Sequence, residues 1–127
     1  LHIPRPDRFS DPVNRSQMLE LCEKYPDIKF IFAHIGRAYF MQGIREAKIE
    51  EFIQFPNAYF DTAMINHAGV LKYTFDHFPA DRILFGSDSP WCDQGAALRW
   101  VKNLGLTDSE YKKITGGNAA KLLEGTL

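Results

Sequence analysis

The sequence has no hydrophobic run long enough to cross a membrane, and it contains little cysteine. None of its apolar stretches approaches the roughly 20 residues that span a bilayer, and no segment has the pattern of a secretory signal. Its two cysteines, Cys22 and Cys92, lack the C-x-x-C spacing of redox and zinc motifs. We therefore expect reduced thiols in a cytoplasmic protein that has no membrane partner.

An excess of charge of one sign is also missing. The chain carries 15 Lys and Arg residues against 16 Asp and Glu residues, for a formal net charge of -1. Nucleic-acid-binding domains usually show a basic patch or an overall basic balance, so we expect no nucleic-acid partner. The sequence does not begin with methionine, and we expect that an upstream part is missing from it.

Apolar runs alternate with helical patterns along the 127 residues, which are enough for one modest domain with a hydrophobic core. Strand-like segments are followed by helix-like segments with short connections, the arrangement of βαβ units in a parallel sheet with helices on its outer face. We expect four parallel strands, adjacent in chain order. The expected strands are 1–3, 28–34, 58–61 and 82–86, and the expected helices are 11–25, 43–55, 68–78, 95–102, 107–115 and 118–124.

The segment 82–91 is the part of the sequence that first suggests a binding site. Ile83, Leu84 and Phe85 form an apolar run typical of a strand buried on both faces. The run leads through Gly86 and Ser87 to Asp88, and ligands of α/β proteins bind at the carboxyl ends of such strands. Asp88 is therefore either a carboxylate at a pocket floor or a cap for the turn that follows.

Every expected strand ends near a histidine or an aspartate: His2, His34, Asp61 and Asp88. Catalytic side chains at the carboxyl ends of successive strands are typical of a (β/α)8 barrel, and His and carboxylate groups are usual ligands of Zn²⁺ and related metals. The alternative for His34 is a core histidine bonded to backbone. For Asp61 we favour a structural role, such as orienting its neighbour.

Four motifs carry a family resemblance: His-Ile-Gly-Arg (34–37), Tyr-Phe-Asp-Thr (59–62), Arg-Ile-Leu-Phe-Gly-Ser-Asp-Ser-Pro (82–90) and Gly-Asn-Ala-Ala-Lys-Leu-Leu (117–123). In this order they resemble the C-terminal half of an amidohydrolase-related protein. That branch of metal-dependent TIM barrels includes aminocarboxymuconate semialdehyde decarboxylase. The resemblance covers nearly the whole chain and implies that residues 1–127 are a single partial domain holding strands five to eight of the α/β barrel.

The resemblance also implies roles for individual residues. The metal-binding histidine of strand five falls on His2, the catalytic acid or base of strand six on His34, and the aspartate of strand eight, a ligand or a base, on Asp88. The expected cofactor is a divalent metal, with Zn²⁺ as first choice. Arg37 replaces a glycine found in many members; it either holds a substrate carboxylate or pairs with an acid. Trp91 either lines the pocket mouth and contacts substrate or only packs.

The function implied is a metal-dependent hydrolase that cleaves a C–N or ester bond of a small-molecule substrate. The alternatives are a metal-dependent decarboxylase and a truncated half-barrel that turns nothing over. The His-x-His motif of the family's first strand is absent, so we expect the isolated chain to be inactive. A half-barrel also has two free sheet edges. Inward-facing strand residues, such as Phe30, Phe32, Phe60 and Leu84 on whichever face proves internal, are expected to lose the opposite half of their core. We therefore expect a homo-oligomer or association with the missing N-terminal half.

Overall fold

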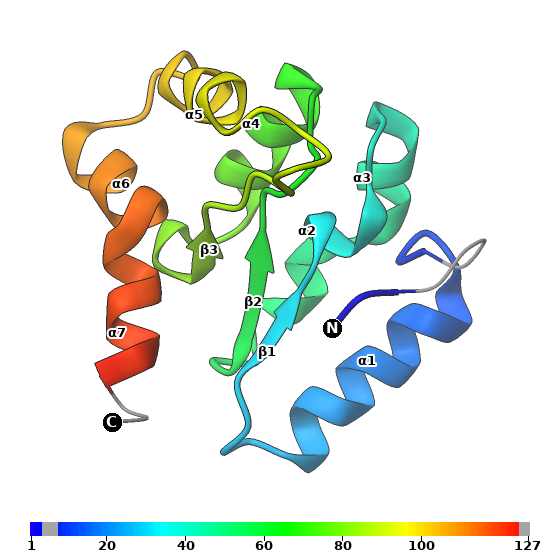
Figure 1. Ribbon diagram of the computed structural model, residues 1–127. Coiled ribbons are helices and arrows are strands. Elements are labelled where there is room, and N and C mark those ends of the chain that lie inside the picture. Colours follow the sequence, from blue (N-terminus) through cyan, green and yellow to red (C-terminus); the bar gives the residue numbers. More distant parts are fainter. Residues whose placement is uncertain (4–7, 125–127) are drawn as a thin grey trace.

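The computed structural model describes residues 1–3 and 8–124, and it contains a parallel sheet (Figure 1). The strands of this part of the chain are β1 (Phe30–Phe32), β2 (Ala58–Asp61) and β3 (Ile83–Leu84), in the order β1-β2-β3. Both pairings are parallel, with Phe32 opposite Phe60 and Phe60 opposite Ile83. The predicted α/β class, the parallel pairing and the chain-order adjacency are confirmed for these strands.

Residues 1–3 do not form the predicted fourth strand, although they lie beside β1. The Leu1 carbonyl accepts a hydrogen bond from the Ala33 amide at 2.8 Å, and the Leu1 amino group donates to the Ile31 carbonyl. The ladder goes no further because the carbonyl of Ile3 accepts from the Arg37 side chain instead of from a strand. The segment therefore has the predicted position without the predicted ladder.

Most helices follow the predicted pattern, but one predicted helix is interrupted, and the helical segments His34–Arg37 and Ala80–Arg82 were not predicted. Asp11 caps the first helix by accepting from the Val13 amide, and Thr107 and Glu110 form the predicted capping box. The predicted helix 43–55 is divided, because Lys48 adopts a left-handed conformation with φ 46°. The helical segments are α1 (Pro12–Lys24), α2 (His34–Arg37), α3 (Met41–Ala47), η1 (Ile49–Phe52), α4 (Ala68–His77), η2 (Ala80–Arg82), α5 (Gln94–Lys102), α6 (Asp108–Lys112), η3 (Lys113–Gly117) and α7 (Asn118–Glu124).

Asn118 does not cap α7 as predicted. Its side-chain nitrogen donates to the carbonyls of Ala80 at 2.7 Å and Ile83 at 2.8 Å. The side chain therefore links the start of the last helix to the start of β3. Cys22 and Cys92 are free thiols, as predicted. Among the described residues no helix is long and apolar enough to cross a membrane.

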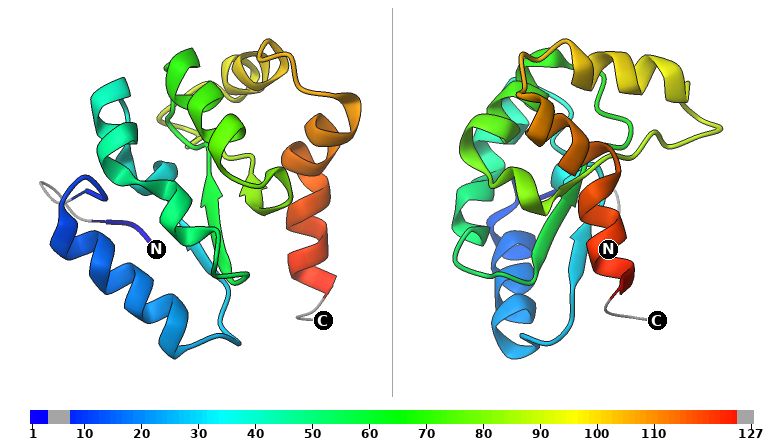
Figure 2. Two further views of the ribbon diagram at one scale, coloured as in Figure 1. Left: turned by 180° about the vertical axis from the view of Figure 1, so that it is seen from behind. Right: turned by 90° about the vertical axis from the view of Figure 1, so that its left-hand side faces the viewer.

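The core lies between the sheet and the helices that cover one of its faces. When the molecule is seen from behind, α3 and α4 lie on the viewer's side of the sheet (Figure 2, left). Phe32 and Phe60 are fully buried there, with ring centroids 5.6 Å apart. Their rings pack against Phe9 and Phe52, which stack at 5.0 Å. Phe32 and Phe60 stay buried in this chain because they face the helices, so the loss of core that we expected for inward-facing residues does not apply to them.

The other face of the sheet carries the alternate residues of each strand. Ile31 is paired with Tyr59, and Asp61 with Leu84. Ile31 is 36% exposed and Tyr59 is half-buried, whereas the helix-facing residues between them are buried. In a closed barrel this face would line the interior. In Figure 1 it is turned toward the viewer.

Candidate functional site

His34 begins a left-handed turn directly after β1. The φ angles of His34, Ile35, Gly36 and Arg37 are 57°, 50°, 63° and 64°, so α2 is left-handed. This conformation costs about 1–2 kcal/mol for each residue that has a Cβ. Such a turn persists only where the surrounding structure holds it in place.

Contacts on two sides hold this turn. Asp61, the last residue of β2, accepts hydrogen bonds through Oδ1 from the amides of His34 at 2.8 Å and Ala63 at 3.0 Å. On the other side the Phe9 amide donates to the Gly36 carbonyl at 3.1 Å. A Cβ at position 36 would lie 2.5 Å from the Phe9 ring, so this position requires glycine.

The ring of His34 is oriented by the loop after β2. Its Nδ1 lies 3.0 Å from the Ala63 carbonyl oxygen. A carbonyl oxygen only accepts, so Nδ1 carries the proton and Nε2 of the neutral ring is left with its lone pair. The side chain is only 5% exposed. His34 is thus bonded to backbone, as in a structural histidine, and also presents the nitrogen that a ligand or a base needs.

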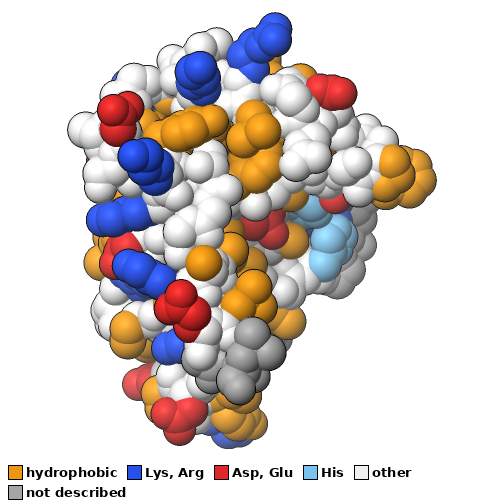
Figure 3. Space-filling view, turned by 60° about the vertical axis from the view of Figure 1, so that its left-hand side comes forward, with side chains coloured by type: hydrophobic (Ala, Val, Ile, Leu, Met, Phe, Trp, Pro, Cys, Tyr) orange, Lys and Arg blue, Asp and Glu red, His pale blue; other side chains and the backbone are white. Residues whose placement is uncertain are grey.

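His2 lies next to His34, with ring centroids 5.1 Å apart in an edge-to-face arrangement. Its pKa is lowered, first by loss of hydration and then by the positive charges of His34 and Arg37, while the Asp88 carboxylate acts in the opposite direction. A lowered pKa favours the neutral imidazole, which is the form that binds metals. Figure 3 shows histidine side chains on one face of the molecule, grouped with acidic and hydrophobic side chains.

Asp88 follows β3 in a loop that is tied to the loop after β2. The Thr62 hydroxyl lies 3.2 Å from the Gly86 amide, to which it is an acceptor, and it donates to the Gly86 carbonyl at 3.3 Å. A Cβ at Gly86 would lie 2.9 Å from that of Ala63, so the close approach needs glycine. Asp88 is half-buried with φ 65°, and its carbonyl accepts from the amides of Trp91 and Cys92. Its backbone carbonyl, rather than its side chain, accepts the hydrogen bonds of the turn that follows, and its carboxylate acts to raise the pKa of His2.

His2, His34 and Asp88 therefore share the carboxyl edge of the sheet, and His2 and His34 are in ring contact. Two neutral imidazoles and a carboxylate are suitable donors for Zn²⁺ or Mn²⁺. However, no group of three or more His, Cys, Asp and Glu residues in the described part of the chain is arranged to hold a metal alone. The donors fit part of a coordination shell, and their sharing of one metal stays a prediction.

Arg37 and Trp91, the predicted substrate contacts, have opposite environments. Arg37 is 5% exposed and donates through Nη1 to the Ile3 carbonyl at 2.9 Å. The ion pairs of the described residues do not include it. Trp91 is 83% exposed, so it does not pack into the core of this chain. Contact of either residue with substrate stays a prediction.

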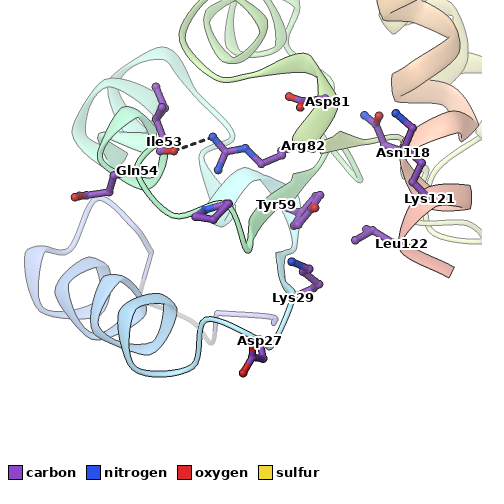
Figure 4. A pocket seen from close by; sticks show the side chains of 11 residues that line it. Asp27, Lys29, Ile53, Gln54, Tyr59, Asp81, Arg82, Asn118, Lys121 and Leu122 are labelled. Atoms are coloured by element: carbon purple, nitrogen blue, oxygen red, sulfur yellow. Dashed lines mark hydrogen bonds between the residues drawn. The ribbon is translucent and has the colours of Figure 1, made fainter. Parts of the chain in front are cut away.

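A hollow of about 620 Å³ lies at the other end of the sheet (Figure 4). Lys29, Tyr59 and Arg82 line it from the amino ends of the strands. Arg82 is already engaged, because its guanidinium donates to the carbonyls of Ile53 at 2.9 Å and Phe55 at 2.5 Å. The residues that line the hollow include none of the predicted site residues.

Two contributors to the site were not identified from the sequence. The Ala63 carbonyl orients the His34 ring, but a backbone carbonyl leaves no signal in the residue type. The Thr62 hydroxyl joins two loops, and the available signal was its place directly after Asp61 at a strand end. The suggested role of Asp61 in orienting a neighbour agrees with its hydrogen bond to the His34 amide.

The chain is similar to known proteins along almost its whole length. Residues 1–125 match the Amidohydrolase family. A curated relative, the gamma-resorcylate decarboxylase of Polaromonas sp. (strain JS666), is 31% identical over 82% of this chain and 36% of its own length. The chain thus spans little more than a third of that relative.

Solved structures are also similar to this chain over most of its length. A dihydroxybenzoic acid decarboxylase from Polaromonas sp. JS666, with bound manganese and the inhibitor 2-nitroresorcinol, superposes with a TM-score of 0.64 at 30% identity, covering 84% of this chain and 37% of that one. An uncharacterised TIM-barrel protein from Bordetella bronchiseptica superposes with a TM-score of 0.68 at 24% identity, and the match covers 87% of this chain and 39% of that one. With a family match along almost its whole length, the chain belongs to the Amidohydrolase family.

Proposed function

We propose that the parent protein, meaning the whole protein that contains residues 1–127, is a divalent-metal-dependent decarboxylase of a hydroxylated aromatic acid. The observation that carries the proposal is the grouping of His2, His34 and Asp88 at the carboxyl edge of the sheet. In support, the named relatives at 30% and 31% identity are decarboxylases of dihydroxybenzoic acids. This chain would supply strands five to eight of the barrel.

The reaction exchanges a carboxylate for a proton on an aromatic carbon. The ring carbon that bears the carboxylate accepts a proton, the C–C bond breaks, its electron pair restores the aromatic ring, and CO₂ leaves. A bound divalent cation supplies Lewis acidity that neutralises the negative charge of the acid. His2 and Asp88 are the residues of this chain that would hold it, with further donors coming from the rest of the parent protein.

His34 is the residue that we assign to proton transfer. Because Nδ1 stays bonded to the Ala63 carbonyl, Nε2 is the atom that gains and gives the proton. The Asp61 carboxylate and the buried turn fix its backbone, so the ring does not have to reorganise during the step. The imidazolium gives its proton to the ring carbon and regains one from solvent.

The hydrolase interpretation, our first from the sequence, is less well supported. Hydrolysis needs an activated water and the same metal ligands, so the site residues do not exclude it. The relatives at 30% identity or more nevertheless have decarboxylase names. A half-barrel without activity stays the expectation for residues 1–127 alone.

Incubation of the parent protein with 2,6-dihydroxybenzoate and Mn²⁺ or Zn²⁺ in D₂O tests the proposal. We expect release of CO₂ and one deuterium at the carbon that carried the carboxylate. Matched anilides and aryl esters, which a hydrolase would cleave, should stay intact. Cleavage of the amide or ester without CO₂ release from the acid would replace the proposal by the hydrolase interpretation.

A further inference from the structure

Arg37 is a buried cation whose hydrogen bond reaches the segment that carries His2. Its Nη1 donates to the Ile3 carbonyl at 2.9 Å, and its guanidinium carbon lies 5.8 Å from the centre of the Tyr39 ring. Burial of a cation is costly unless it is hydrogen-bonded. A guanidinium that is 5% exposed and bonded in this way is a fixed structural anchor rather than a solvated charge.

Segment 1–3 is attached to β1 and the turn after it through both neighbours of His2, Leu1 and Ile3. The Leu1 carbonyl accepts from the Ala33 amide at 2.8 Å, and the Ile3 carbonyl accepts from Arg37. Ala33 directly precedes His34, and Arg37 closes the left-handed turn that His34 begins. With both of its neighbours attached around His34, His2 is held where its ring meets the His34 ring.

We propose that Arg37 is a positioning residue, which holds His2 as a metal ligand beside His34 by bonding the carbonyl of Ile3. This inference rests on the proposed function and extends it to a residue that acts on the metal through the Ile3 carbonyl. Groups that orient a ligand typically contribute about 10–100-fold to metal affinity. Nε of Arg37 is buried and has no hydrogen-bond partner among the described residues, so the bond from Nη1 to Ile3 is the side-chain hydrogen bond by which Arg37 is held there.

The test is the Zn²⁺ dissociation constant of the metal-free parent protein, measured by competition with a chromogenic chelator. Arg37→Met should weaken Zn²⁺ binding about tenfold or more. Arg37→Lys should restore part of the affinity, because an ammonium group can still donate to the Ile3 carbonyl. Arg8→Met is the matched control: Arg8 lies over the same Tyr39 ring at 5.8 Å, but its contacts among the described residues do not include Ile3. It should bind Zn²⁺ like wild type.

Thermal unfolding of the metal-free variants separates loss of positioning from loss of fold. If Arg37→Met does not fold, Arg37→Gln takes its place, with the same expected weakening. Wild-type Zn²⁺ affinity in the folded variant would overturn the proposal. If in addition KM for the aromatic acid rose while kcat stayed unchanged, Arg37 would be a substrate contact instead. The binding constant needs no turnover, so a parent protein without decarboxylase activity would still decide the role of Arg37.

Discussion

At the residue scale, His34 is oriented by two different groups, one in the last residue of β2 and one in the loop that follows it. The Asp61 carboxylate holds its backbone amide, and the Ala63 carbonyl holds its ring. Asp61 also accepts from the Ala63 amide, so one carboxylate fixes both the histidine and its partner. A change at Asp61 should therefore alter His34 without touching its side chain.

Asp61→Ala tests this arrangement. The substitution leaves two amides without their charged acceptor, and hydrogen bonds to charged groups contribute roughly 1.5–3 kcal/mol each to stability. We expect the free energy of unfolding of the parent protein, measured with urea, to fall by about 3 kcal/mol or more. Asp76→Ala, which removes only the exposed pair with Lys72, should change it by less than about 1 kcal/mol. Equal effects of the two substitutions would contradict the role of Asp61.

The sequence indicated which side chains meet at this edge, but not what holds them. His2, His34 and Asp88 each follow an apolar run, and the ends of parallel strands share one edge of a sheet. Their supporting contacts involve the carbonyls of Ala63 and Ile3. Every residue has a carbonyl, so its use as an acceptor cannot be predicted from residue types.

At the scale of secondary-structure elements, the left-handed turn α2 is the least predictable feature of the chain. His-Ile-Gly-Arg contains one glycine, whereas four successive residues have positive φ. The prediction of one helix over 43–55 is wrong for a related reason. The apolar spacing continues across Lys48, and nothing in the sequence indicates that Lys48 adopts a left-handed conformation that ends α3. Ordinary helices with caps, such as α1 and α6, were predictable because Asp11 and Thr107 mark their starts.

Gly36→Ala should destabilise the turn more than strain alone would. A Cβ at position 36 meets the Phe9 ring, whereas Gly105 has a similar φ of 72° and open space around its Cβ position. We expect Gly105→Ala to cost about 1 kcal/mol and Gly36→Ala clearly more than about 2 kcal/mol, because overpacking adds to the strain. Urea midpoints of both variants measure the difference. Equal midpoints would show that Phe9 moves aside without cost.

The capping box of α6 should make the helix sensitive to acid. The Thr107 hydroxyl and amide, which bond the Glu110 carboxylate, lower the pKa of that carboxyl. A lowered pKa in the folded state means that the contribution to stability is present above the unfolded value of about 4.3 and is lost as pH falls through the folded value. NMR titration should show the Glu110 pKa rising in Thr107→Val. An unchanged pKa would exclude the hydroxyl as its cause.

At the scale of the whole molecule, the sheet has one covered face and one open face. The phenylalanine core lies on the helix side, so residues 1–127 keep more of their core than we expected of a half-barrel. Ile31 and Tyr59 lie on the opposite face. The relatives are more than twice as long as the segments that they share with this chain, and the remainder of a barrel would cover this face.

Residues 1–127 alone should therefore self-associate or bind the rest of the barrel. Exposed apolar surface costs roughly 25 cal/mol per Å², and an open face and free strand edges favour association. Sedimentation velocity at micromolar concentration should show dimers or larger species, and addition of the N-terminal part of the parent protein should convert them to a defined complex. A compact monomer with cooperative unfolding would contradict this expectation.

The central claim is that His34 and Asp88 serve one metal-dependent decarboxylation site at the carboxyl edge of the sheet. The most direct measurement is the rate of CO₂ release from 2,6-dihydroxybenzoate by the metal-loaded parent protein, with bound metal quantified in each sample. We predict that His34→Asn loses at least about a hundredfold in kcat, the scale of general acid–base catalysis, while it stays folded. Asp88→Asn should lose both metal and turnover. Wild-type rates and metal content in both variants would contradict the account.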